Sequence, residues 1–100
     1  MNNIEILKDY IDTQGAIKQD LKPHMPENSE SYFIDYGATQ VIVTITEHDI
    51  DIELIKGDKA ISYTEPLGIF NLLVVSIDYW YHYIVDDLRA KLWEAQNGSK

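Results

Sequence analysis

Residues 67–77 read Leu67-Gly-Ile-Phe-Asn-Leu-Leu-Val-Val-Ser-Ile77, and residues 79–83 add an aromatic run, Tyr79-Trp-Tyr-His-Tyr83. The first run is apolar nearly all round, which is typical of a helix that is buried on most sides. Beyond it, apolar residues recur at helical spacing and predict one buried stripe: Ile77, Trp80, Tyr81, Ile84, Leu88 and Leu92. The segment from Glu65 to Trp93 therefore predicts one long, mostly buried helix that the rest of the chain must cover.

This helix is expected to begin near Thr64, whose side chain is a suitable N-cap. Glu65 in the first turn would complement the helix dipole, and Pro66 is tolerated at that position. The apolar run is too short to cross a bilayer, which needs ~20 mostly apolar residues. Asn71 and Ser76 also interrupt it. We therefore interpret the segment as a core helix rather than a membrane span.

A shorter helix is predicted at the N-terminus, over residues 3–13. One stripe of apolar residues supports it: Ile4, Leu7 and Ile11. Asn2 or Asn3 can cap this helix, and Glu5 lies where a capping-box acid belongs if Asn2 is the cap. The sequence therefore predicts an amphipathic helix that packs on the rest of the core.

The continuation of that helix is ambiguous, because Gly15 weakens the pattern. Ile17 and Leu21 could extend it, as one interrupted helix or as two short ones. Pro23 begins a polar connector, residues 23–31, that must end any helix here.

Four stretches after the connector predict strands, because β-branched and aromatic residues alternate with polar ones: residues 32–36, 39–47, 50–55 and 60–63. His48-Asp49 is the expected turn between the second and third. A tight hairpin there would pair Ile45 with Ile52 and Val43 with Leu54 on the buried face. A second turn is expected at residues 56–59.

The element order α-β-β-β-β-α predicts an α+β two-layer sandwich. An N-terminal helix precedes an antiparallel sheet of three or four strands, and a long C-terminal helix follows it. The length suits a single domain, which we place at residues 1–96, with a disordered tail at residues 97–100.

Charge limits the class of partner. Seventeen acidic residues face eight basic ones, which gives a formal net charge of −9. Direct binding to nucleic acid or to an anionic membrane surface needs basic side chains, so we expect neither. A basic protein partner would instead be attracted and steered. The chain has no cysteine and no signal-peptide pattern, so we expect a cytoplasmic protein.

One candidate site is the polar stripe of the C-terminal helix. Asp78, His82 and Asp86 are spaced by four residues, so a helix places them on one face. They could bind a metal ion or transfer protons, as in a small metal-dependent enzyme. Alternatively they could be a solvent-exposed stripe in which Asp–His pairs stabilise the helix slightly. Tyr79 and Tyr83 flank this stripe, and exposed tyrosines are common at protein interfaces.

A second candidate site is the acidic hairpin, which comprises Glu47, Asp49, Asp51 and Glu53. Its residues alternate along a strand, unlike the ligands of a calcium loop. The strip could mimic a run of phosphates and occupy a basic groove, or it could simply solvate one face of the strand.

These features of size, charge and missing chemistry resemble small acidic, cysteine-free α+β proteins that act by binding. That category includes phage-encoded inhibitors of host defence or of nucleic-acid enzymes, and immunity proteins that neutralise basic toxins. The resemblance implies a non-enzymatic inhibitor that occupies a basic, nucleic-acid-binding surface of its partner. We expect no catalytic residue, metal or cofactor. Two alternatives stay open: a homodimer packed through the aromatic C-terminal helix, and the metal-dependent enzyme.

Overall fold

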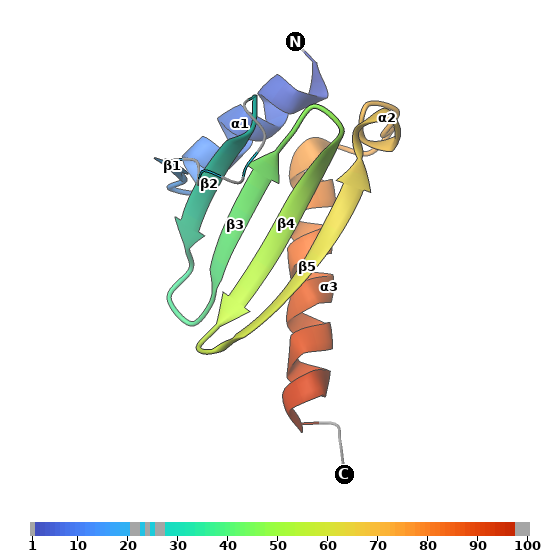
Figure 1. Ribbon diagram of the computed structural model, residues 1–100. Helices are drawn as coiled ribbons and strands as arrows, with labels where there is room; N and C mark the ends of the chain where they lie inside the picture. The colour runs from blue at the N-terminus through green and yellow to red at the C-terminus, as the bar shows by residue number, and fades with distance from the viewer. Residues whose placement is uncertain (1, 21–22, 24, 26–27, 98–100) are drawn as a thin grey trace.

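The computed structural model describes residues 2–20, 23, 25 and 28–97 (Figure 1). Its elements follow the chain in this order: α1 (Asn3–Thr13), β1 (Ile17–Gln19), β2 (Glu30–Asp35), β3 (Gln40–Ile45), β4 (Asp49–Lys56), β5 (Lys59–Pro66), α2 (Leu67–Phe70) and α3 (Ile77–Asn97). The strands form one antiparallel sheet in the order β1-β2-β3-β4-β5, and α1 and α3 cover the same face of it. The predicted α+β sandwich is confirmed, with five strands instead of three or four.

The N-terminal helix forms where the sequence predicts it. The Asn2 side chain accepts a hydrogen bond from the Glu5 backbone N–H at 2.9 Å, so Asn2 is the N-cap. Leu7 and Ile11 are fully buried and attach the helix to the core. Gly15, with a φ of 85°, then reverses the chain at the helix end.

The possible continuation of this helix through Ile17 is wrong. Ile17 instead begins β1, which pairs antiparallel with β2 through Ile17 and Phe33. The left-handed backbone at Gly15 explains the difference, because it sends the chain back along the sheet edge. Leu21, the other residue of that prediction, lies outside the described residues.

The β3–β4 hairpin has the predicted faces but not the predicted register. Ile45 pairs with Ile50 and Val43 with Ile52, two residues away from the expected partners. The turn accounts for the shift, because the Thr46 hydroxyl accepts hydrogen bonds from the backbone N–H groups of His48 and Asp49 at 3.1 Å. The turn is therefore centred before Asp49, which joins β4. A shift of two keeps every side chain on its predicted face.

The prediction of one continuous C-terminal helix is wrong for the residues before Ile77. Thr64 and Glu65 belong to β5, which stays paired with β4 up to Pro66 opposite Asp49. One short helix, α2, follows; residues 71–76 then form a connection without regular structure, and α3 begins only at Ile77. Pairing with β4 extends the predicted strand at residues 60–63 through Thr64, Glu65 and Pro66, which replaces the helix start expected there.

The core lies between the helices and the inner face of the sheet. Alternate residues of β3 and β4 are buried there: Val41, Val43, Ile45, Ile50, Ile52 and Leu54. The predicted stripe of α3 packs on them, since its six residues from Ile77 to Leu92 are all buried. Trp80 also donates its indole N–H to the buried Glu65 carboxylate at 3.1 Å, which fixes α3 against β5.

The last described element is helix α3. Helix α3 continues to Asn97, the first residue of the expected tail, and residues 98–100 lie outside the described residues.

Candidate functional site

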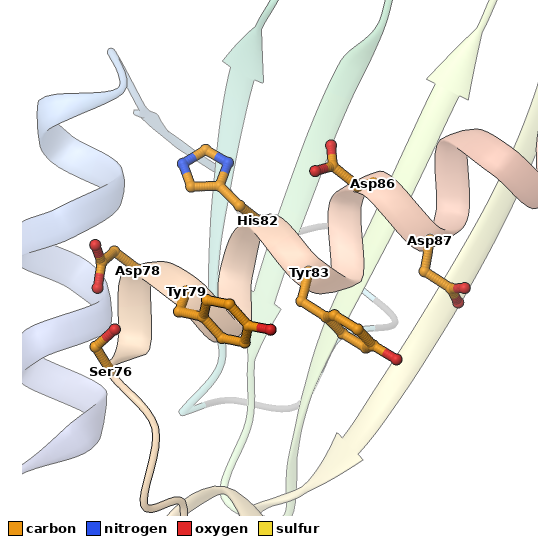
Figure 2. A pocket seen from close by; sticks show the side chains of 7 residues that line it. All are labelled: Ser76, Asp78, Tyr79, His82, Tyr83, Asp86 and Asp87. Carbon is orange, nitrogen blue, oxygen red and sulfur yellow. The ribbon is translucent and has the colours of Figure 1, made fainter.

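The outward side of α3 carries a shallow, open hollow (Figure 2). The residues that line it come from α3 and the residue before it: Ser76, Asp78, Tyr79, His82, Tyr83, Asp86 and Asp87. Tyr79 and Tyr83 are 60% and 61% exposed, and their rings stack with centroids 6.3 Å apart. We call Asp78, Tyr79, Tyr83, Asp86 and Asp87 the α3 face. It presents two aromatic rings between carboxylates.

Asp78 lies in the first turn of α3. A hydrogen bond from the Ser76 side chain lowers the pKa of this carboxyl group below its ordinary value. Backbone N–H groups of the first turn and the nearby His82 lower it further. The carboxylate therefore stays ionised at the positive end of the helix dipole.

His82 is less available than the predicted stripe suggests, because it is half-buried between α1 and α3. Its Nε2 atom is hydrogen-bonded to the Tyr10 hydroxyl of α1. The imidazole also packs edge-on against Tyr10, with ring centroids 5.5 Å apart. Burial raises the pKa of Tyr10, and the negative charge of Asp78 raises it further. His82 thus joins the two helices.

Asp86 and Asp87 continue the acidic side of the α3 face, each beside a basic residue of the same helix. Asp86 pairs with Arg89 at 3.1 Å, and Asp87 pairs with Lys91 at 3.0 Å. Exposed pairs of this kind contribute little to stability and leave their carboxylates accessible. The Arg89 guanidinium group also lies over the Tyr36 ring, 5.3 Å from the centroid.

The hypothesis of a metal-dependent enzyme needs side chains that are grouped closely enough to bind one metal ion. Within residues 2–20, 23, 25 and 28–97, no three His, Cys, Asp or Glu side chains are grouped to hold a metal ion. Asp78, His82 and Asp86 do lie on neighbouring turns of α3, as predicted, but the imidazole is turned toward α1.

An exposed apolar loop leads directly into the α3 face. Residues 71–76 connect α2 to α3, and Leu72 and Val74 in this segment are 79% and 98% exposed. Val75 is also exposed, as is Ile69 in the preceding helix. We call Leu72, Val74 and Val75 the apolar loop. Large exposed aliphatic side chains that adjoin a rim of charge are typical of protein-binding surfaces.

The acidic hairpin lies on a different surface. Asp49, Asp51 and Glu53 alternate with the buried residues of β4, so they point to the open face of the sheet, over which none of the described helices lies. Asp51 accepts a hydrogen bond from the Thr64 hydroxyl at 2.8 Å, and Asp49 accepts one from the Thr46 hydroxyl at 3.0 Å. These carboxylates are half-buried among strand neighbours.

Glu47 is the residue of the acidic hairpin that lies outside strand β4. It occupies the turn between β3 and β4 and accepts a hydrogen bond from the Asn28 side-chain amide at 2.6 Å. The predicted partner-binding residues therefore divide between two opposite sides of the sandwich. One flat partner surface cannot contact the acidic hairpin and the α3 face together.

The apolar loop is the feature that sequence reasoning missed. The sequence does contain a sign of this loop, in the residues that interrupt the apolar run. Gly68 and Asn71 are poor helix formers, and Ser76 followed by Asp78 is typical of a helix start. Two adjacent β-branched residues, Val74 and Val75, further weaken the helix. Together they predict a break where α3 begins.

Comparison of the chain with known protein families, with curated proteins and with solved structures finds no match. Along the part of the chain that the structure describes, no helix has the length and apolar character needed to cross a membrane. Function must therefore be argued from the surfaces themselves.

Proposed function

We propose that this chain is a non-enzymatic protein-binding module whose α3 face and apolar loop dock on a basic surface of a partner protein. The observation that carries the proposal is the joint exposure of Leu72, Val74, Tyr79 and Tyr83 beside carboxylates. Tyrosine is one of the residue types that supply most of the affinity at protein interfaces, and exposed aliphatic side chains beside it add apolar area that a partner can bury.

Charge gives the partner its chemical class. The chain carries a net charge of −9, and Asp78, Asp86 and Asp87 surround the two exposed rings. Lysine or arginine side chains of a partner would pair with these carboxylates and stack on the tyrosine rings. A basic surface that normally binds nucleic acid meets these requirements, so occupying it would make the chain an inhibitor. The absence of cysteine fits a reducing compartment such as the cytoplasm.

A homodimer through the same helix is the alternative for this surface. Like charges oppose it, because the acids of both copies would meet in one interface. Measuring the mass of the protein in solution separates the two: a monomer at all concentrations supports the inhibitor, and a dimer that hides Tyr79 and Tyr83 supports the alternative.

Affinity capture from a cell lysate with two charge-matched variants tests the proposal. Asp86→Lys with Asp87→Lys alters the α3 face, and Asp51→Lys with Glu53→Lys alters the acidic hairpin by the same charge. We expect wild type and the hairpin variant to retain the same basic protein, and the α3 variant to lose it. Retention by the α3 variant, or loss only by the hairpin variant, would contradict the proposal.

A further inference from the structure

The outer edge of β5 is the one long strand edge that lies beside the α3 face. Within the described residues β5 pairs only with β4, along all eight of its residues, Lys59–Pro66. Ala60, Ser62 and Thr64 on this strand are exposed, and their side chains are small. Natural proteins usually protect such an edge with charge, proline or a bulge, because an open edge recruits another strand.

The hydrogen-bond pattern identifies the backbone groups that face outward. The Leu67 N–H donates a hydrogen bond to the His48 carbonyl at 2.9 Å, and these two residues continue the β4–β5 register. The odd-numbered residues of β5 therefore form the backbone hydrogen bonds to β4. Residues alternate in an antiparallel ladder, so the N–H and C=O groups of Ala60, Ser62 and Thr64 point away from the sheet. These three residues offer three donors and three acceptors to an added strand.

One stripe of α3 stands beside this edge. Trp80 contacts β5 through Glu65, and Tyr83 and Asp87 lie three and seven residues further on, so helical geometry turns them to the same side. Figure 2 shows the Tyr83 and Asp87 side chains projecting together, away from His82. An added strand would send alternate side chains toward the helix layer, next to an aromatic ring and a carboxylate.

We propose that β5 accepts an extended segment of the partner as a sixth strand, with lysine or arginine at the alternate positions that face α3. This inference rests on the proposed function and names the form in which the partner is recognised. Backbone hydrogen bonds to Ala60, Ser62 and Thr64 would provide affinity, and Tyr83 and Asp87 would select the basic side chains.

A second copy of this chain fits the edge less well than a basic segment does. Two copies would each bring a net charge of −9 to the contact. Helix α3 also crosses behind β5 (Figure 1), so pairing two copies edge to edge would place a second acidic α3 on the same side of the joined sheet. A single extended segment has no such helix.

The test is amide hydrogen exchange measured by NMR with a defined probe, a short peptide of alternating lysine and threonine. In the free protein we expect fast exchange at Ala60, Ser62 and Thr64, and slow exchange at Ile61 and Tyr63, which bond to β4. At ~90% saturation the probe should slow the three outward amides by ~10-fold. A peptide of alternating glutamate and threonine should leave them unchanged.

A matched pair of variants controls for fold. Ser62→Pro removes only an outward N–H, so the ladder to β4 remains while the probe loses its central hydrogen bond. Ser62→Ala keeps that N–H. We expect the proline variant to weaken probe binding by at least ~10-fold and the alanine variant to bind as wild type does.

The outcomes separate this inference from the proposed function. If the probe leaves the exchange of the three outward amides unchanged, strand addition is overturned. The same holds if Ser62→Pro binds the probe as well as Ser62→Ala does. The proposed function would still stand in either case if the α3 charge-reversal variant loses the captured partner.

Discussion

The two acidic surfaces of this molecule differ in what accompanies their charge. On the open face of the sheet, Asp49 and Asp51 are half-buried and accept hydrogen bonds from threonine hydroxyls of their own chain. On the α3 face, the carboxylates surround exposed rings of Tyr79 and Tyr83 and adjoin the apolar loop. The two surfaces are therefore alike in charge, and the exposed apolar area beside the carboxylates is what favours the α3 face in our proposal.

The largest expected effect comes from removing the exposed aromatic rings. The double variant Tyr79→Ala, Tyr83→Ala should weaken partner binding by ~1,000-fold, because truncating a hot-spot side chain costs ~2 kcal/mol and the variant truncates two. Its melting temperature should stay close to that of wild type, since both rings are more than half exposed. Titration calorimetry with the captured partner and thermal melts check this. Ile17→Ala, on the exposed edge of the sheet, is the control and should bind normally.

The next effect concerns the attachment of α3 to the sheet. Trp80→Phe should destabilise the fold by about 1–3 kcal/mol, because the buried Glu65 carboxylate loses its indole N–H donor. Chemical denaturation measures the change. The double variant Trp80→Phe, Glu65→Leu should recover part of the loss, since it removes both polar partners. A double variant that is no more stable than the single one would contradict this role for the hydrogen bond.

A smaller effect is expected at the start of α3. The pKa of Asp78 is lowered in the folded protein, so its stabilisation is present above its unfolded pKa and disappears as the pH falls through the folded pKa. Asp78→Asn should lower the melting temperature at pH 7, and the difference from wild type should vanish in strong acid. Thermal melts across that range check the sign; an equal difference at every pH would contradict it.

The smallest effect belongs to the open face of the sheet. Thr64→Val removes the hydroxyl that donates to Asp51 and keeps the shape of the side chain. We expect a loss of about 1 kcal/mol or less in the free energy of unfolding. Partner binding should not change, because the variant keeps the outward backbone N–H and C=O groups of residue 64. Weakened binding in this variant would return the acidic hairpin to consideration as the binding surface.

Much of the fold could be predicted from local patterns. The cap at Asn2, the alternation of β3 and β4 and the buried stripe from Ile77 to Leu92 all follow from spacing of residue types. The hairpin register could not, because the Thr46 hydroxyl decides the turn by bonds that alternation does not record.

The secondary structure and the burial of the apolar run could not be predicted from its composition, because an apolar segment need be neither helical nor buried. Residues 67–77 have the composition of a buried helix, yet only Phe70 and Ile77 are buried there. Pairing of β5 with β4 extends the sheet to Pro66 and forces a connection before α3. For the candidate site, the outward position of Tyr79 and Tyr83 was predictable from helical spacing, whereas the contact of His82 with α1 depends on tertiary packing.

The most direct test of the central claim is methyl NMR of the isoleucine, leucine and valine side chains, with and without the captured partner. One spectrum reports on both surfaces. Leu72, Val74 and Val75 lie beside the α3 face, and Ile17 and Ile42 lie on the open face of the sheet. We expect shifted or broadened signals for the first three residues and unchanged signals for the other two. Perturbation confined to Ile17 and Ile42 would contradict the central claim.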